Sequence, residues 1–347
     1  MSFSRIDAGD FVVSADSVTA PAWSNNITVL SSFYTTSPLL TGSYYVDVYN
    51  ADPAVATASI QFSVAYGRKD GSGSAPLNPL VVGNSPTRIT YGQYKNIVYG
   101  DPELYVNFGG LNTDSPDIIA IQVDRNRYKE SLFPGTFALQ LSGSGGLVKL
   151  TDNSNDVTTV TYLDCGRAYN IVSGSNGSSA NSPTLTGAQK GYTVSGSYGL
   201  FLPDVGLILL NPRALALPGA QGGIELNFLS GSADNTVQGS SYNNHAIFSA
   251  INTGGYFGLN SQETISSNYV FVRVRNAEFN YTTNPSIFLS ASDGTFIYSN
   301  FINSPQTFPT TVGMYNDNNE LLAVAKLSKP LTKDFTKEAL IRVKLDW

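Results

Sequence analysis

The last 36 residues of the chain, 312–347, read VGMYNDNNELLAVAKLSKPLTKDFTKEALIRVKLDW. Apolar side chains recur at alternate positions in residues 321–327 and 339–345, which is the pattern of a strand with one buried face. In the second run they alternate with Arg342, Lys344 and Asp346. We predict two strands here, the last of them held in a sheet or an interface near Trp347, because loose chain ends fray.

The composition of the whole chain favours sheets over helices. Aromatic residues make up 12% of the 347 residues and charged residues only 13%. Tyr, Phe, Val, Ile and Thr fit strands, while the Gly, Asn and Ser between the apolar runs serve turns. We therefore expect a mainly β protein of several antiparallel, sandwich-like domains with one or two short helices.

Turn-rich segments divide the chain into three expected domains. Residues 1–150 form a β-rich N-terminal domain with a helix candidate at residues 85–100. Residues 151–240 form an inserted or middle β domain with a mobile Gly/Ser/Asn-rich loop at residues 173–182. Residues 241–347 form a C-terminal β domain, and the polar segment 230–244 contains the boundary before it.

Three further segments have a specific predicted structure. In residues 59–64 Ile60, Phe62 and Val64 alternate with polar residues, which predicts a strand with one buried and one solvated face. Residues 198–210 are strongly apolar and interrupted by Pro203, which predicts two strands joined at that point. A short helical turn is expected just after residue 211.

Charge and hydropathy favour some partners over others. The chain has 26 acidic and 20 basic residues, a formal net charge of −6, which gives no attraction for phosphate backbones. No apolar run approaches the roughly 20 residues that span a bilayer, and residues 1–11 lack a signal-peptide pattern. We expect a soluble protein, made in a cytoplasm, that binds neither nucleic acid nor a membrane.

The residue types that carry most enzyme chemistry are scarce. Cys165 and His245 are the only cysteine and histidine, so one chain can form neither an internal disulfide nor a thiolate zinc site. His245 lacks a G-x-S-x-G partner motif and opens a strand-like run, which favours a surface or interface histidine. Cys165 is more simply a small buried residue than a nucleophile activated by Arg167.

Three segments with charged side chains have possible binding roles. Asp152 and Asp156 enclose the sequence DNSND, whose alternating oxygen ligands suit calcium but lack the glycine and distal glutamate of an EF-hand. The GRKDGSGS segment at residues 67–74 lacks phosphate-loop spacing and is expected to be an exposed loop. A solvated face or a docking edge for an acidic neighbour accounts for Lys326, Lys329, Lys333 and Lys337. We assign no catalytic, cofactor-binding or metal-binding residue.

The C-terminal sequence also resembles a known family. Residues 312–317 (VGMYND), 320–330 (ELLAVAKLSKP) and 333–340 (KDFTKEAL) are similar to a C-terminal signature of virion structural proteins of tailed bacteriophages, especially cyanobacterial myoviruses. Residues 281–286 (YTTNPS) and 198–212 resemble earlier parts of the same pattern. The resemblance marks a fold and an assembly role and carries no catalytic motif.

The resemblance implies a structural component of the virion tail, at the baseplate or where fibres attach. Its implied partners are other tail or baseplate proteins and further copies of the chain, in a particle assembled in the host cytoplasm. A low-charge β chain of this composition suits large subunit interfaces. The alternative is a receptor-binding or carbohydrate-degrading tail protein, and a calcium-stabilised module at Asp152 to Asp156 is a third hypothesis.

The terminal strand gives a first prediction. If Ile341 and Leu345 face a covered side of the sheet, replacing either with Ala lowers the free energy of unfolding by roughly 2 to 5 kcal/mol. Denaturant unfolding of the full chain measures this loss. A loss below about 0.5 kcal/mol, as at ordinary surface sites, would place the side chain on the solvated face.

Overall fold

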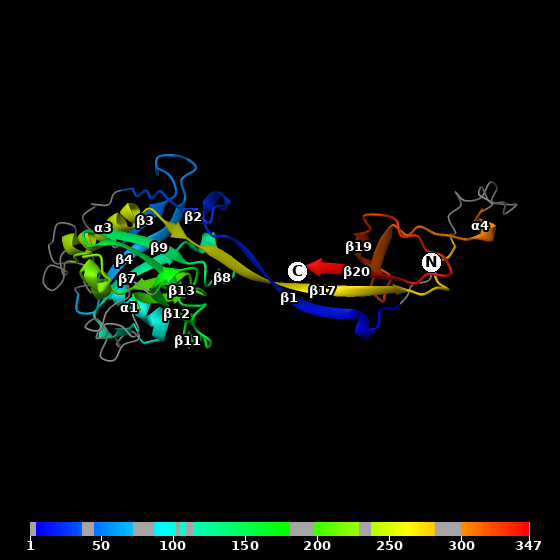
Figure 1. Ribbon diagram of the computed structural model, residues 1–347, viewed down its shortest axis with the longest axis horizontal. Helices are drawn as coiled ribbons and strands as arrows, with labels where there is room; N and C mark the ends of the chain where they lie inside the picture. The colour runs from blue at the N-terminus through cyan, green and yellow to red at the C-terminus, as the bar shows by residue number, and fades with distance from the viewer. Residues whose placement is uncertain are drawn as a thin grey trace. The chain divides into compact units, whose positions relative to one another are not determined.

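The computed structural model describes residues 5–36, 45–71, 87–101, 105–108, 114–180, 197–228, 237–281 and 300–346. Antiparallel sheets predominate among them, which confirms the prediction of a mainly β protein (Figure 1). Residues 72–74 of the GRKDGSGS segment lie outside the described residues.

The chain forms two compact units. Unit 1 comprises Met1–Ser17 and Thr264–Trp347, and unit 2 comprises Val18–Glu263. The chain passes from one unit to the other within strands β1 (Phe11–Pro21) and β17 (Asn260–Val274). The domain boundaries expected near residues 150 and 240 fall within β10 (Gly146–Asp152) and α3 (Val237–Gly254), which both belong to unit 2.

One large sheet organises unit 2. From one edge to the other its strands are β2 (Val29–Leu30), β16 (Phe257–Gly258), β9 (Ala138–Gly143), β10, β12 (Gly166–Ser175), β14 (Gly199–Leu202), β15 (Leu207–Leu210), β7 (Asp117–Val123), β4 (Ile60–Arg68) and β3 (Val46–Tyr49). Neighbours on this path are antiparallel. The short strands β11 (Thr161–Leu163) and β13 (Ser178–Ser179) pair with β12.

The two edges of this sheet are linked by the segment that follows β2. There, Tyr34 donates its backbone N–H to the carbonyl oxygen of Tyr49 at 3.1 Å and accepts the Tyr49 N–H at 2.8 Å. Since Tyr49 lies in β3, at the far edge from β2, these bonds hold the two edges together. The sheet therefore curls around one of its faces.

An aromatic cluster fills the enclosed face. The ring of Phe257 lies 4.8 Å from Trp23, 5.1 Å from Phe62 and 6.1 Å from Phe137, centroid to centroid. All four side chains are buried. The indole Nε1 of Trp23 donates to the carbonyl oxygen of Phe257 at 2.9 Å, so its polar atom is satisfied inside the core. Tilted and edge-to-face rings of this kind add to the stabilisation that burial alone provides.

A helix covers the opposite face of β4 and β7. This is α1 (Thr87–Tyr99), which confirms the helix predicted at residues 85–100. A Cβ atom at Gly67 in β4 would lie only 2.8 Å from the backbone nitrogen of Tyr91, so the helix packs directly on the strand. The Tyr91 hydroxyl donates to the carbonyl oxygen of Ser115 at 2.6 Å and accepts the N–H of Val106 at 2.7 Å.

The predicted solvated face of β4 is therefore wrong. Besides the glycine under α1, Gln61 on that face is fully buried. Its Nε2 donates to the hydroxyl of Ser24 at 2.7 Å and to the carbonyl oxygen of Ser59 at 2.8 Å. A polar side chain at an alternating position here forms a buried hydrogen-bonded cluster, which alternation alone cannot distinguish from exposure to water.

The apolar stretch 198–210 forms β14 and β15, joined at residues 203–206 as predicted.

By contrast, residues 173–180 form a β12–β13 hairpin instead of the predicted mobile loop. Asn176 and Gly177 occupy its turn with φ angles of 53° and 74°. These are the positive angles that an Asn-Gly hairpin turn requires. Residues 181 and 182 lie outside the described part of the chain.

Helix α3 replaces the strand-like run predicted from residue 243 onward. Ile247 and Ile251 are fully buried one turn apart, and the helix packs on β9 and β4. Buried Asn244 accepts the backbone N–H of Tyr66 in β4 at 2.7 Å. With 18 residues α3 is longer than the short helices expected.

The other α-helices in the described part of the chain are α2 (Pro212–Leu215), which confirms the short helix predicted after residue 211, and α4 (Asn300–Asn303).

Short elements complete the description. They are the 3-10 helices η1 (Ala8–Asp10), η2 (Ser24–Asn26), η3 (Arg125–Arg127) and η5 (Gly219–Gln221), and the strands β5 (Val106–Asn107), β6 (Asp114–Ser115) and β8 (Ser131–Leu132). β5 pairs with β6, and β8 pairs with the start of β17.

Unit 1 contains both strands predicted from the C-terminal sequence. In its main sheet β17 lies between β1 and β20 (Ala339–Asp346), and Val270 pairs with Val343. These two valines are buried, while Ile341 and Leu345, which alternate with Val343 in β20, are half-buried. A separate hairpin is formed by β18 (Thr311–Tyr315) and β19 (Leu321–Lys326).

The aromatic cluster of unit 2 gives a second prediction. Replacing Phe257 with Ala is expected to lower the free energy of unfolding by about 3 to 5 kcal/mol, because the cavity left behind is bounded by rings held on several strands. Urea unfolding of the full chain measures the loss. The control is Leu147→Ala in β10, whose side chain is 51% exposed and whose replacement is expected to change stability by less than about 0.5 kcal/mol.

Candidate functional site

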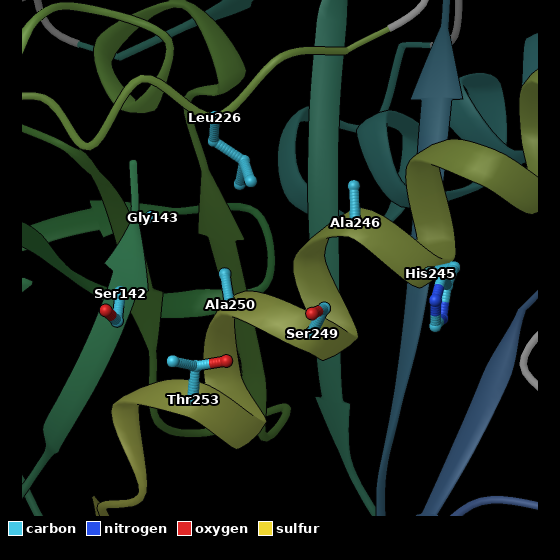
Figure 2. A pocket seen from close by; sticks show the side chains of 8 residues that line it. All are labelled: Ser142, Gly143, Leu226, His245, Ala246, Ser249, Ala250 and Thr253. Carbon is cyan, nitrogen blue, oxygen red and sulfur yellow. The ribbon is translucent and has the colours of Figure 1, made fainter. Parts of the chain in front are cut away.

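The histidine lies on α3 beside a cavity of about 430 Å³ (Figure 2). The lining residues are Ser142, Gly143, Leu226, His245, Ala246, Ser249, Ala250 and Thr253. Ser142 and Thr253 lie at one end of this lining and His245 at the other (Figure 2). None of these residues carries a carboxylate, a thiol or an aliphatic amine, so the lining offers His245 no charged partner.

The imidazole of His245 packs on an aromatic ring. Its centroid lies 6.4 Å from that of Phe248, at an interplanar angle of 25°. Its Nδ1 atom is buried and has no hydrogen-bond partner among the described residues. A catalytic imidazole needs a group that fixes its tautomer and orientation, and the described surroundings of His245 do not supply one.

Cys165 lies in the turn between β11 and β12, half-buried against the apolar cluster under α1. Burial raises the pKa of its thiol, and the Asp204 and Asp164 carboxylates raise that pKa further. The guanidinium of Arg167 binds elsewhere: its Nη2 lies 2.6 Å from Asp204 Oδ1 and 3.0 Å from the Ser131 hydroxyl. The suggested lowering of the Cys165 pKa by Arg167 is therefore wrong.

The Arg167–Asp204 pair is a structural connection within unit 2. Asp204 lies in the β14–β15 turn, and it also accepts the backbone N–H of Arg167 at 2.7 Å. The two side chains are about one-quarter to one-third exposed, 26% and 32%. A bidentate guanidinium–carboxylate pair of this kind fixes geometry between β12 and the neighbouring turn.

The oxygen-rich sequence at residues 152–156 is engaged with the backbone. The carboxylate of fully buried Asp152 accepts N–H groups from Gly135, at 2.9 and 3.0 Å to its two oxygens, and from Ser154 at 3.0 Å. Asp156 accepts the N–H of Ser179 at 2.6 Å. Over the described residues there is no group of three or more His, Cys, Asp or Glu side chains arranged to hold a metal ion. These carboxylates cap turns next to the β12–β13 hairpin.

The four lysines of the docking hypothesis have different environments. Lys333 is fully buried, and its ammonium donates to the carbonyl oxygens of Asn276 and Asp334 and to Asn280 Oδ1 at 2.6 to 3.0 Å. Lys337 forms an ion pair with Asp334 at 3.3 Å. Lys326 and Lys329 are exposed, and no ion pair with another described residue involves them. The docking hypothesis therefore remains open for these two lysines only.

Exposed apolar side chains mark unit 1 as the candidate interaction surface. Among its described residues, Val270 and Val343 are the only apolar side chains that are buried. The exposed large apolar residues, which we call the apolar surface of unit 1, are Ile6, Phe11, Val12, Val13, Phe279, Tyr281, Ile302, Phe308, Tyr315, Leu321, Leu322, Val324, Phe335 and Leu340. Exposed apolar side chains that form a contiguous patch on a soluble protein mark an interaction site.

One sequence feature indicates this surface, although it does not follow the alternating pattern of a strand with one buried face. Phe11, Val12 and Val13 are consecutive, so they cannot all face the same side of β1, and all three are exposed. An edge strand with three neighbouring exposed apolar residues is a template for association with another chain.

Comparison with models of known protein families, with curated proteins and with solved structures finds no match. In the described part of the chain, no helix has both the length and the hydropathy needed to cross a bilayer.

The environment of Cys165 gives a third prediction. Because burial raises the pKa of its thiol, iodoacetamide at pH 7.5 should alkylate Cys165 more slowly in the folded chain than in the same chain in urea. Mass spectrometry over time measures both rates. Faster alkylation of the folded chain would reveal an activated thiolate and would reinstate Cys165 as a nucleophile candidate.

Proposed function

We propose that this chain is a structural component of the virion of a tailed bacteriophage, in the tail baseplate or where fibres attach. It acts through protein–protein contacts in a particle assembled in the host cytoplasm. Two lines of reasoning support the proposal. One is the resemblance of the C-terminal sequence, and the other is the apolar surface of unit 1.

The apolar surface is the observation that carries the assembly role. Burying apolar area stabilises a protein by roughly 25 cal/mol per Å², and a folded unit of this size normally encloses a core of its own. Unit 1 has only two buried apolar side chains among its described residues. A neighbouring subunit that covers the exposed residues supplies the missing burial, as obligate subunit interfaces do.

The charged contacts of unit 1 do not replace that burial. Arg273 and Lys344 each contact an aspartate of the N-terminal segment, Asp10 at 2.7 Å and Asp16 at 3.1 Å. Hydrogen bonding to Lys344 lowers the pKa of Asp16, yet Asp16 and Lys344 are both exposed. Ion pairs with a solvent-exposed partner add little stability, so these two pairs specify geometry without supplying a core.

A fourth prediction tests this function. Leu340 in β20 is 63% exposed, so Leu340→Gln should leave the stability of the purified chain almost unchanged. If its side chain is covered in the particle, the substitution should reduce incorporation into virions about tenfold, the factor that about 1.4 kcal/mol of interface free energy represents. Quantitative mass spectrometry of purified particles measures incorporation.

The matched control is Ile89→Gln on α1, whose side chain is 56% exposed in unit 2 and which should be incorporated normally. Labelling of a tagged chain by electron microscopy then locates it on the tail. Absence of the chain from purified virions, or complete infectious tails on particles that lack it, would refute the proposed function.

A further inference from the structure

The β18–β19 hairpin has one continuous apolar face. Gly313 pairs with Val324 and Tyr315 pairs with Leu321, which places these residues on the same side of the hairpin. Tyr315, Leu321 and Val324 are 44%, 52% and 59% exposed. A Cβ atom at Gly313 would lie 3.0 Å from Tyr315 Cε2 and 3.4 Å from Leu321 Cδ1, so these side chains meet over the glycine. We call Tyr315, Leu321 and Val324 the hairpin patch.

The other face of the hairpin differs. Val312 pairs with Ala325 and Met314 with Ala323, and these four side chains are half-buried. An isolated two-stranded hairpin is at best marginally stable in water. The exposed patch is therefore the face whose coverage adds most to the stability of this element.

Opposite charges lie at the two ends of the patch. Asp317 is in the turn that follows Tyr315, and Lys326 is at the far end of β19, paired with Thr311. Both are exposed, and neither forms an ion pair with another described residue. Consider a two-fold axis that lies in the plane of contact and runs across the strands. A second hairpin related by this axis packs its patch on the first and places its Lys326 at the Asp317 end of the first.

We propose that the hairpin patch packs against the same patch of a second copy of this chain, in an antiparallel two-fold arrangement. The inference rests on the proposed function, since it names one partner of the apolar surface of unit 1. A two-fold contact requires a surface complementary to itself, and a patch with an acidic end and a basic end meets that requirement. An acidic or a basic partner protein would match only one of the two ends.

The contact extends beyond the patch. A stable dimer buries at least about 1,200 Å² in total, more than three partly exposed side chains per copy provide. The additional area comes from other members of the apolar surface of unit 1. Leu322, the bulged residue beside the patch, is 68% exposed and lies next to it in the chain.

Sedimentation equilibrium of the purified full chain gives the first test. The chain should associate at concentrations up to about 0.1 mM, where even a weak interface forms. Val324→Lys should raise the dissociation constant at least about tenfold, with an unchanged circular dichroism spectrum and melting temperature. The matched control is Ile89→Lys, of nearly equal exposure in unit 2, which should associate as the unaltered chain does.

Two results would overturn the inference at this stage. One is an unaltered chain that stays monomeric throughout the concentration range. The other is an equal loss of association in Val324→Lys and Ile89→Lys, because the patch would then have no special part in the contact.

A charge exchange tests the antiparallel arrangement. Asp317→Lys and Lys326→Asp should each weaken self-association, because like charges then meet at both ends of the contact. An equimolar mixture of the two variants should associate, since every lysine in the mixed dimer faces an aspartate. Raising the salt concentration should reduce the difference between single variants and mixture. A mixture that stays as dissociated as its components would overturn the arrangement.

These tests separate the inference from the proposed function. A chain that dimerises through the patch but is absent from virions refutes the function and leaves the contact standing. A chain that is present in virions but never self-associates refutes the contact and leaves the function standing.

Discussion

The curling of the large sheet around a single apolar face is the constraint on which the rest of unit 2 depends. The backbone hydrogen bonds between Tyr34 and Tyr49 hold its two edges together, and Phe257, Trp23 and Phe62 meet inside. Helix α3 adds Ile247 and Ile251 to the core on this enclosed face, while helix α1 covers the outer face of β4 and β7. Each face of the central strands is thus buried within one unit.

Unit 1 is organised differently, although it shares β1 and β17 with unit 2. The start of β17 pairs with β8, and its end pairs with β20 from Ser267 to Val274. In this second part the buried apolar contact among the described residues is limited to Val270 and Val343. Buried polar interactions, above all the three hydrogen bonds of the Lys333 ammonium, fix the connecting loops. Such bonds determine geometry but add modest net stability.

Local sequence patterns predicted the strands and α1 because their signals are local. Alternation in β19 and β20, the proline between β14 and β15, and helical spacing in α1 all act within one element. Helix α3 was missed because its polar N-terminal half hides the buried pair Ile247 and Ile251. The β12–β13 hairpin was missed although Asn176 and Gly177 are a recognised turn signal, because the serines around them suggested a loop.

The environments of the candidate residues could not be predicted, because partners distant in sequence decide them. Arg167 binds Asp204, and the buried ammonium of Lys333 donates hydrogen bonds to Asn276 and Asn280. The exposure of the hairpin patch could not be predicted for the same reason. Alternation of apolar residues distinguishes the two faces of a strand but does not indicate which face another element covers. If a subunit binds only the folded form of unit 1, mass action stabilises that form by RT ln(1 + [L]/Kd). The stability of unit 1 would then rise with the concentration of its partner. Folding of unit 1 and assembly would be coupled.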